Sequence, residues 1–138
     1  MAGAASAPAP KVVPAAAVAA TADRSQISTH ILDTGKGKPA GGVPVTLEAK
    51  KGNDDGNGWQ KVADGVTNSD GRIDDLGPKT LDPGVYRLTF QTGDYFAKQK
   101  IDTFYPSITI EFTLPDNTQH YHVPLLLSPF AYSTYRGS

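Results

Sequence analysis

The stretch VPVTLEA, residues 43–49, alternates apolar and polar side chains with a period of two. In an extended strand successive side chains point to opposite faces, so Val45 and Leu47 share one face while Thr46 and Glu48 share the other. One apolar and one polar face are typical of a strand in an antiparallel sheet that packs one side against a core. Residues 43–49 therefore predict a half-buried β-strand.

The same alternation returns in VYRLTF (residues 85–90) and in SITIEF (residues 107–112). Short connections rich in Gly, Asn, Asp or Pro separate the apolar runs, among them GNDDGNG, NSDGR, DPG and LPDNT. Only GDYFAKQK, residues 93–100, favours a short helix, because Asp94 near its start and lysines near its end suit the helix dipole. About seven or eight strands with one short helix predict an all-β sandwich of two antiparallel sheets.

The composition excludes several classes of function. The 138 residues suit one domain, and 13 Lys and Arg against 14 Asp and Glu leave a net charge of -1, which gives no electrostatic reason to bind nucleic acid. The chain has no cysteine, so it has neither a disulfide framework nor a thiol nucleophile. No apolar run approaches the roughly 20 residues that cross a bilayer, so no membrane partner is expected.

The first 24 residues differ in composition from the remainder. They consist almost entirely of Ala, Pro, Gly, Ser and Val, without the large apolar groups that build a core, so we expect residues 1–24 to be a disordered extension. A cleaved secretory signal is the alternative, since Lys11 precedes VVPAAAVAATA, but Pro14 interrupts that weak apolar run. Residues 25–138 form the expected folded domain.

Three histidines are candidates for chemistry. His120 and His122 flank Tyr121 in HYHVPLLLSP, so in a strand both imidazoles would leave the same face, and His30 lies in a second strand-like run, STHILD. Each histidine alone could be merely structural. Together they could form a three-imidazole zinc site, or one imidazole could act without metal as a general base. An unperturbed imidazole has a pKa of about 6.5, so a base of this kind predicts a rate that falls as the pH drops through that value.

Arg72, in NSDGRIDDL, has two interpretations as well. It could form a surface ion pair with Asp74 or Asp75, or it could present its fixed fork of N–H donors to a carbonyl or oxyanion of a planar substrate. The end of the chain, YRGS, adds Arg136 and the hydroxyl of Ser138. No phosphate-binding loop, nucleophile elbow or paired-carboxylate spacing occurs elsewhere.

Three separated motifs in the chain resemble those of the transthyretin-related 5-hydroxyisourate hydrolases. They are STHILDTGKGKPAGGVPVTL (residues 28–47), GVTNSDGRIDDL (65–76) and HYHVPLLLSPFAYSTYRGS (120–138), and the terminal YRGS is the most specific. The resemblance implies a transthyretin-like (prealbumin-like) sandwich of two four-stranded antiparallel sheets with one short helix. It also implies a homotetramer, a dimer of dimers, with sites that open into a channel between the dimers.

The resemblance further implies an activity, the hydrolysis of 5-hydroxyisourate to 2-oxo-4-hydroxy-4-carboxy-5-ureidoimidazoline in the degradation of urate to allantoin, with no metal and no other cofactor. It implies that the last residues line the site and reach across a subunit boundary. It also implies that His120 is not one of the catalytic residues, because the family's usual catalytic positions do not include it. The implied catalytic residues are His30, Arg72, His122 and Ser138. The implied substrate-binding residues are His30, Arg72, Tyr135, Arg136, Gly137 and Ser138.

A second function belongs to another class of protein. The same fold also serves as a carrier of thyroid hormone or another small ligand without catalysis, and this is the alternative to the hydrolase. The residues expected to separate the two are His30, Arg72, His122 and the YRGS end, all of which are present. We expect a cytoplasmic protein, with the peroxisome and the periplasm as alternatives, although RGS at the end does not resemble a peroxisomal SKL signal.

Overall fold

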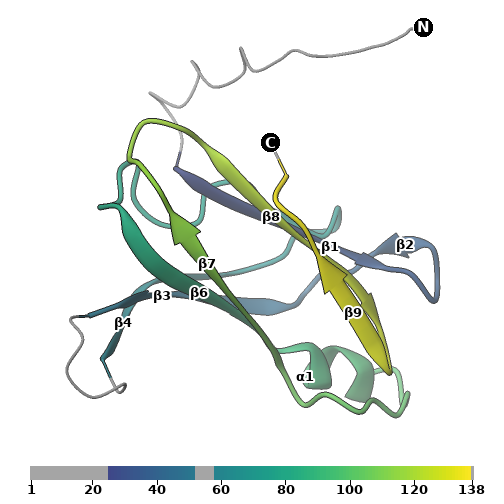
Figure 1. Ribbon diagram of the computed structural model, residues 1–138. Coiled ribbons are helices and arrows are strands. Elements are labelled where there is room, and N and C mark those ends of the chain that lie inside the picture. The colour runs from purple at the N-terminus through teal and green to yellow at the C-terminus, as the bar shows by residue number, and fades with distance from the viewer. Residues whose placement is uncertain (1–24, 52–57, 138) are drawn as a thin grey trace, which may run out of the picture.

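The chain folds as a sandwich of two β-sheets with one short helix (Figure 1). The structure is a computed structural model that describes residues 25–51 and 58–137. The expected extension (residues 1–24), most of the GNDDGNG loop and Ser138 lie outside the described residues. The fold class predicted from the sequence, an all-β sandwich of two sheets with one short helix, is confirmed.

The strands divide between the sheets as follows. The first sheet has the order β2 (Lys38–Pro39), β1 (Ile27–Asp33), β8 (Tyr121–Ser128) and β9 (Ala131–Thr134), and β5 (Arg72–Ile73) also pairs with β1. The second sheet has the order β4 (Trp59–Val66), β3 (Pro44–Lys50), β6 (Gly84–Phe90) and β7 (Ile108–Leu114). The three stretches with period-two alternation are therefore β3, β6 and β7, three neighbouring strands of one sheet.

Two details of the first sheet differ from the prediction of two four-stranded antiparallel sheets. β1 and β8 run parallel, with Ser28 opposite His122. The sheet also contains a fifth strand, because β2 and β5, each of two residues, pair with successive parts of the same edge of β1. Alternation is a property of one strand alone, whereas strand direction depends on the path of the chain between two strands, so the sequence pattern could not supply it.

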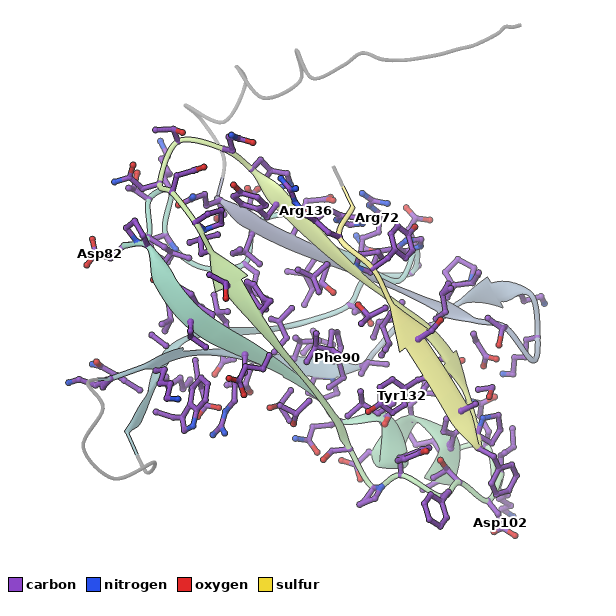
Figure 2. The ribbon with its side chains drawn as sticks, in the orientation of Figure 1. Arg72, Asp82, Phe90, Asp102, Tyr132 and Arg136 are labelled. Atoms are coloured by element: carbon purple, nitrogen blue, oxygen red, sulfur yellow. The ribbon has the colours of Figure 1, made fainter. Side chains whose placement is uncertain are left out.

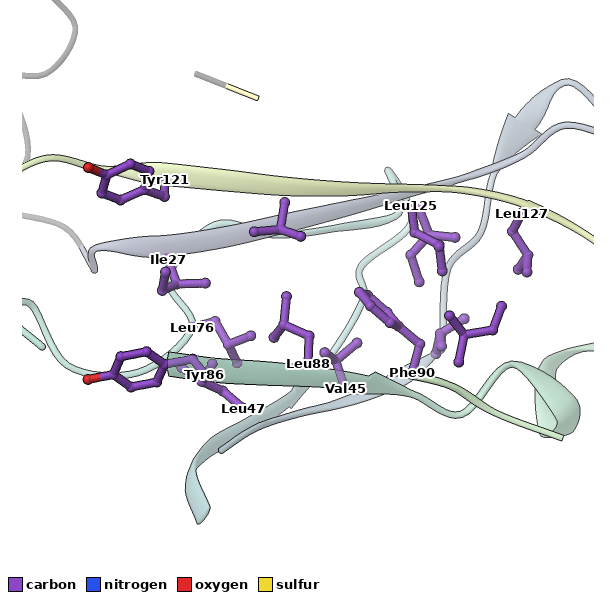
Figure 3. Close-up of a cluster of buried hydrophobic side chains, with 14 of the residues drawn as sticks. Ile27, Val45, Leu47, Leu76, Tyr86, Leu88, Phe90, Tyr121, Leu125 and Leu127 are labelled. Atoms are coloured by element: carbon purple, nitrogen blue, oxygen red, sulfur yellow. The ribbon is translucent and has the colours of Figure 1, made fainter. Parts of the chain in front are cut away.

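The core lies between the two sheets and follows the alternation. Val45 and Leu47 on β3 are fully buried, while Thr46 and Glu48 are only half-buried on the other face. Figure 3 shows Leu125 of β8 above Leu88 and Phe90 of β6, across the space between the sheets. Each fully buried side chain of this size contributes about 1.5–3 kcal/mol relative to an exposed one, so this apolar interior holds the sheets together.

The helix α1 (Thr92–Ala97) follows β6, and it ends before the predicted boundary at residue 100. Lys98 is its C-terminal cap and Lys100 has a φ of 60°, so the lysines form the turn after the helix instead of its last turn. The hydroxyl of Tyr95 donates a 2.7 Å hydrogen bond to Asp33 at the end of β1, which ties α1 to the first sheet. Among the described residues, no helix is long and apolar enough to cross a membrane.

Candidate active site

The outer face of the first sheet carries most of the predicted site residues. On β1, Ile27 and Ile31 point into the core, so Ser28 and His30 between them point outward. On β8, Tyr121 is buried in the core and His122 points outward in the same way. The parallel register places Ser28 opposite His122, and the outward side chains of the two strands therefore meet.

The three imidazoles gather around this pair of strands. The rings of His30 and His122 are stacked, with their centroids 6.1 Å apart and their planes 26° apart. The hydroxyl oxygen of Ser28 lies 2.7 Å from Nδ1 of His122 and 2.8 Å from Nε2 of His120. The expectation that His120 and His122 share one face is confirmed by their common contact with Ser28.

Arg72 is brought to the site by the short strand β5. Arg72 is the direct antiparallel partner of His30, and the turn before it is fixed by Asn68, whose side-chain oxygen accepts hydrogen bonds from the backbone N–H groups of Asp70 (2.8 Å) and Arg72 (3.1 Å). Gly71 in this turn has a φ of 72°, and its carbonyl accepts a 2.8 Å hydrogen bond from the backbone of Ile31. The turn signal NSDGR thus acts by holding Arg72 against β1.

The ion pair considered for Arg72 is formed. Its Nε donates to Asp74 at 3.2 Å, and both side chains are substantially exposed. Asp75 instead accepts a 2.9 Å hydrogen bond from the backbone of Ser25. A guanidinium has five N–H donors, and within the described part of the chain the side chain of Arg72 bonds to Asp74 through Nε, so its Nη groups are available there for a substrate oxygen.

The C-terminal segment lies across His122. The backbone N–H of Gly137 donates a 2.8 Å hydrogen bond to the carbonyl of His122, and a Cβ at this glycine would lie 3.1 Å from both that oxygen and the imidazole Cδ2. The guanidinium of Arg136 lies over the ring of Tyr121, 5.1 Å from its centroid. Tyr135 is 58% exposed, and Ser138 is outside the described residues.

A hollow adjoins these residues, and only part of the predicted site lines it. Its volume is about 560 Å³, and the described residues that line it are His122, Tyr135, Arg136 and Gly137. His30 stacks with His122, and Arg72 pairs with His30, but neither His30 nor Arg72 lines the hollow. In Figure 2, Arg72 and Arg136 lie in the same part of the view, beside β1 and β8, away from Asp102 and the helix.

The surroundings of the imidazoles favour their neutral forms. Burial is the largest cause that lowers the pKa of His122, to about 4, and the positive charge of Arg72 and the neighbouring His30 and His120 act in the same direction. Burial and then Arg72 also lower the pKa of His30. Both imidazoles are therefore uncharged at neutral pH, and the predicted fall in rate near pH 6.5 moves to lower pH.

The arrangement of three imidazoles around one metal ion, which the sequence left open, does not form. Within residues 25–51 and 58–137, no three His, Asp or Glu side chains are grouped so that they could hold a metal ion. His120 and His122 each turn a ring nitrogen to the hydroxyl of Ser28 instead. Ser28 is the residue of this cluster that sequence reasoning missed, because nothing in STHILD indicates which strand will lie beside it.

A transthyretin-like sandwich with imidazoles and a guanidinium on the outer face of one sheet defines the class of this protein. The model of the HIUase/Transthyretin family matches residues 27–137. The chain belongs to this family, as the sequence motifs indicated.

The similar proteins include hydrolases and a transthyretin in complex with thyroxine. The chain is 52% identical over 128 residues to a 5-hydroxyisourate hydrolase of Salmonella dublin, an alignment that covers 92% of this chain and 91% of the relative. The solved structure of the Klebsiella pneumoniae 5-hydroxyisourate hydrolase is similar with a TM-score of 0.71 and 38% identity, over 83% of this chain and 100% of that chain. Sea bream transthyretin in complex with thyroxine is similar with a TM-score of 0.73 and 35% identity, over 81% and 94%.

Proposed function

We propose that this chain is an enzyme that hydrolyses 5-hydroxyisourate in urate degradation. The observation that carries the proposal is the convergence of His30, Arg72 and His122 on one face of the first sheet, in a chain that is 52% identical to a hydrolase of this substrate. The fold alone does not decide the function, because a thyroxine-bound transthyretin shares it. The side chains on the sheet favour catalysis.

The reaction opens the six-membered ring of the substrate at a cyclic amide. Neutral His122 accepts a proton from the attacking water as the new C–O bond forms. The tetrahedral intermediate then collapses, the C–N bond breaks, and the imidazolium returns the proton to the departing nitrogen. The product is 2-oxo-4-hydroxy-4-carboxy-5-ureidoimidazoline. Each proton that His122 takes is given back, so the chain is unchanged after one turnover.

Arg72 and His30 support this step. The free Nη donors of Arg72 bind the substrate carbonyl and stabilise the negative charge that develops on its oxygen. His30, stacked on His122 at 6.1 Å, orients the water. The positive charge of Arg72 has a second effect, since it helps to keep the pKa of His122 low and thus keeps the imidazole neutral as a base.

The terminal tetrapeptide supplies the rest of the binding site in this proposal. The bond from Gly137 to the carbonyl of His122 holds the segment beside the imidazole, where it forms part of the hollow. Tyr135 and Arg136 contribute to the substrate pocket, and the hydroxyl of Ser138 provides one further hydrogen bond to the substrate.

We also propose that the enzyme is a homotetramer. β7 and β9 are edge strands of the two sheets, and the four residues of β9 are all exposed. Phe104 (72% exposed) and Phe130 (66% exposed) add exposed aromatic surface. Open strand edges and exposed aromatic side chains are typical of surfaces that a second subunit covers. A monomeric mass by light scattering at working concentration would contradict this assembly.

The decay of freshly generated 5-hydroxyisourate, followed by ultraviolet absorbance, tests the activity. Buffer, the protein and the His122→Asn variant are compared, and circular dichroism establishes that the variant is folded. We expect the wild-type protein to accelerate the decay. The rate with His122→Asn should be about 10²- to 10⁴-fold lower than with wild type, which is the usual contribution of general acid–base catalysis. If the protein does not exceed buffer, the hydrolase proposal is wrong, and thyroid-hormone binding is the function to measure.

A further inference from the structure

We propose that Ser28 and His120 are positioning residues that fix the tautomer of His122, so that Nε2 of His122 is the atom that takes the proton from water. The inference rests on the proposed function for its catalytic meaning, but the tautomer itself can be measured without substrate. It follows from a chain of three hydrogen bonds whose donors and acceptors can be assigned in turn.

The first hydrogen bond fixes which group donates and which accepts in all three. Nδ1 of His120 lies 3.0 Å from the backbone carbonyl oxygen of Ser25. A carbonyl oxygen has no hydrogen and can only accept, so Nδ1 of His120 carries a proton and donates it. In a neutral imidazole the other nitrogen then has a lone pair, so Nε2 of His120 is an acceptor.

The second and third bonds follow from the single hydrogen of a hydroxyl. Ser28 lies 2.8 Å from Nε2 of His120 and, because that nitrogen accepts, the hydroxyl donates its only hydrogen there. Nδ1 of His122 lies 2.7 Å from the same oxygen, so Nδ1 must donate to it. His122 is thereby held with its proton on Nδ1 and a lone pair on Nε2.

The surroundings leave these bonds little freedom to rearrange. Ser28 is 1% exposed, so solvent cannot replace either imidazole at its hydroxyl. The parallel register fixes Ser28 opposite His122, and the bond from Gly137 holds the backbone of His122 from the other side. Nδ1 is the ring nitrogen of His122 that bonds to Ser28, and the imidazole lines the hollow, so Nε2 is the nitrogen that remains for water.

This order of donors and acceptors depends on His120 being neutral. A doubly protonated His120 would donate from Nε2 to Ser28, the hydroxyl would donate to Nδ1 of His122, and the proton of His122 would move to Nε2. In that state Nε2 could not act as a base. The neutral and the charged forms of His120 therefore predict opposite tautomers of His122, which makes the inference open to a direct measurement.

Nuclear magnetic resonance of protein labelled with ¹⁵N-histidine distinguishes the two tautomers, because protonated and unprotonated ring nitrogens have well-separated shifts. The signals are assigned by their loss in His30→Asn and His120→Gln. At pH 7.5 we expect His122 to carry its proton on Nδ1. A wild-type His122 protonated on Nε2 would overturn the inference, whether or not the protein hydrolyses 5-hydroxyisourate.

Ser28→Ala tests the hydrogen-bond relay, that is, the bonds that join His120, Ser28 and His122. Thr29→Val is the matched control. Thr29 is the next residue on β1, is also buried, and uses its hydroxyl on the carbonyl of Val123 instead of on an imidazole. In Ser28→Ala we expect the Nε2-protonated form of His122 to increase and kcat to fall about 10- to 100-fold with little change in KM. In Thr29→Val both the tautomer and kcat should stay as in wild type. An unchanged tautomer in Ser28→Ala would exclude the relay.

His120 provides a second test if Ser28→Ala fails to fold. The side-chain oxygen of a glutamine can accept from the Ser28 hydroxyl as Nε2 does, whereas alanine cannot, so His120→Gln should retain most of the Nδ1-protonated form and His120→Ala should lose it. Equal tautomer populations in the two variants would contradict the inference. If wild type shows the expected tautomer but no hydrolysis, the proposed function is wrong while the hydrogen-bond relay is supported.

Discussion

His30 and Arg72 are direct partners in the antiparallel pairing of β1 and β5. Side chains of directly opposed residues project from the same face of a sheet, so this pairing places an imidazole beside a guanidinium. One consequence is electrostatic, because Arg72 contributes to the lowered pKa of both His30 and His122. Burial is the larger cause in both cases, and Arg72 adds to it, so the short strand β5 contributes to the charge state of the site as well as to its geometry.

The pH dependence of catalysis should differ from that of an unperturbed histidine. Because the pKa of His122 is lowered to about 4, the base stays neutral well below pH 6.5. We expect kcat/KM to be nearly constant from pH 7.5 to about 5 and to fall as His122 becomes protonated near pH 4. A half-maximal rate close to pH 6.5 would contradict the lowered pKa.

Stability provides the control for that profile. An unfolded histidine with a pKa of about 6.5 binds a proton that folded His122 excludes until about pH 4, so the free energy of unfolding should decrease as the pH falls through this window. Enzyme that is incubated at each pH and then assayed at pH 7.5 separates reversible protonation from loss of structure. Full recovery of activity would assign the low-pH fall to the base.

Arg72→Lys should reduce catalysis although the charge is kept. Lysine is a point charge and cannot present the forked donors of arginine, so we expect kcat/KM to fall on the order of 10²-fold. Arg87→Lys is the matched control, because Arg87 forms a similar pair with Glu48 on the second sheet and packs on Trp59, remote from the site residues. Equal rates for the two variants in the 5-hydroxyisourate assay would remove Arg72 from the mechanism.

Gly71→Ala should destabilise the turn that presents Arg72. The glycine has a φ of 72°, and a Cβ there would lie 2.5 Å from the carbonyl oxygen of Ile31. We expect a loss of at least about 1–3 kcal/mol in the free energy of unfolding, measured with denaturant, together with reduced activity. Gly37→Ala is the control, since its φ of 69° carries the same backbone strain with nothing within 4 Å of the added Cβ. Equal losses in the two variants would show that the contact with Ile31 is unimportant.

Thr67→Val should destabilise the fold without a change in side-chain shape. The buried hydroxyl of Thr67 donates to the carbonyl of Ala40 at 2.8 Å and accepts from the backbone N–H of Val43 at 2.9 Å. Valine leaves both backbone groups without that partner, so the free energy of unfolding should fall by about 1–3 kcal/mol. Thr89→Val, which removes only an exposed contact with Thr109, should change it by less than about 0.5 kcal/mol. Equal denaturation midpoints for Thr67→Val and Thr89→Val would refute this role for Thr67.

The sequence by itself determined three neighbouring strands of the second sheet and the family. The apolar residues of 43–49, 85–90 and 107–112 alternate because each strand buries one face, and that pattern can be read without knowing the neighbouring strand. The same rule predicted that His120 and His122 share a face. The helix near residue 93 was also predictable, but its end was not, because the turn after it places Lys100 in a left-handed conformation.

Only the tertiary structure decided how the site is assembled. Ser28 meets His120 and His122 because β1 and β8 lie parallel in one particular register, and a shift of one residue would turn Ser28 away from them. Arg72 meets His30 because two residues of β5 pair with β1. Register depends on packing between segments that are far apart in the sequence, whereas periodicity is local, so the pattern identified the candidate residues and the pairing of the strands determined their contacts.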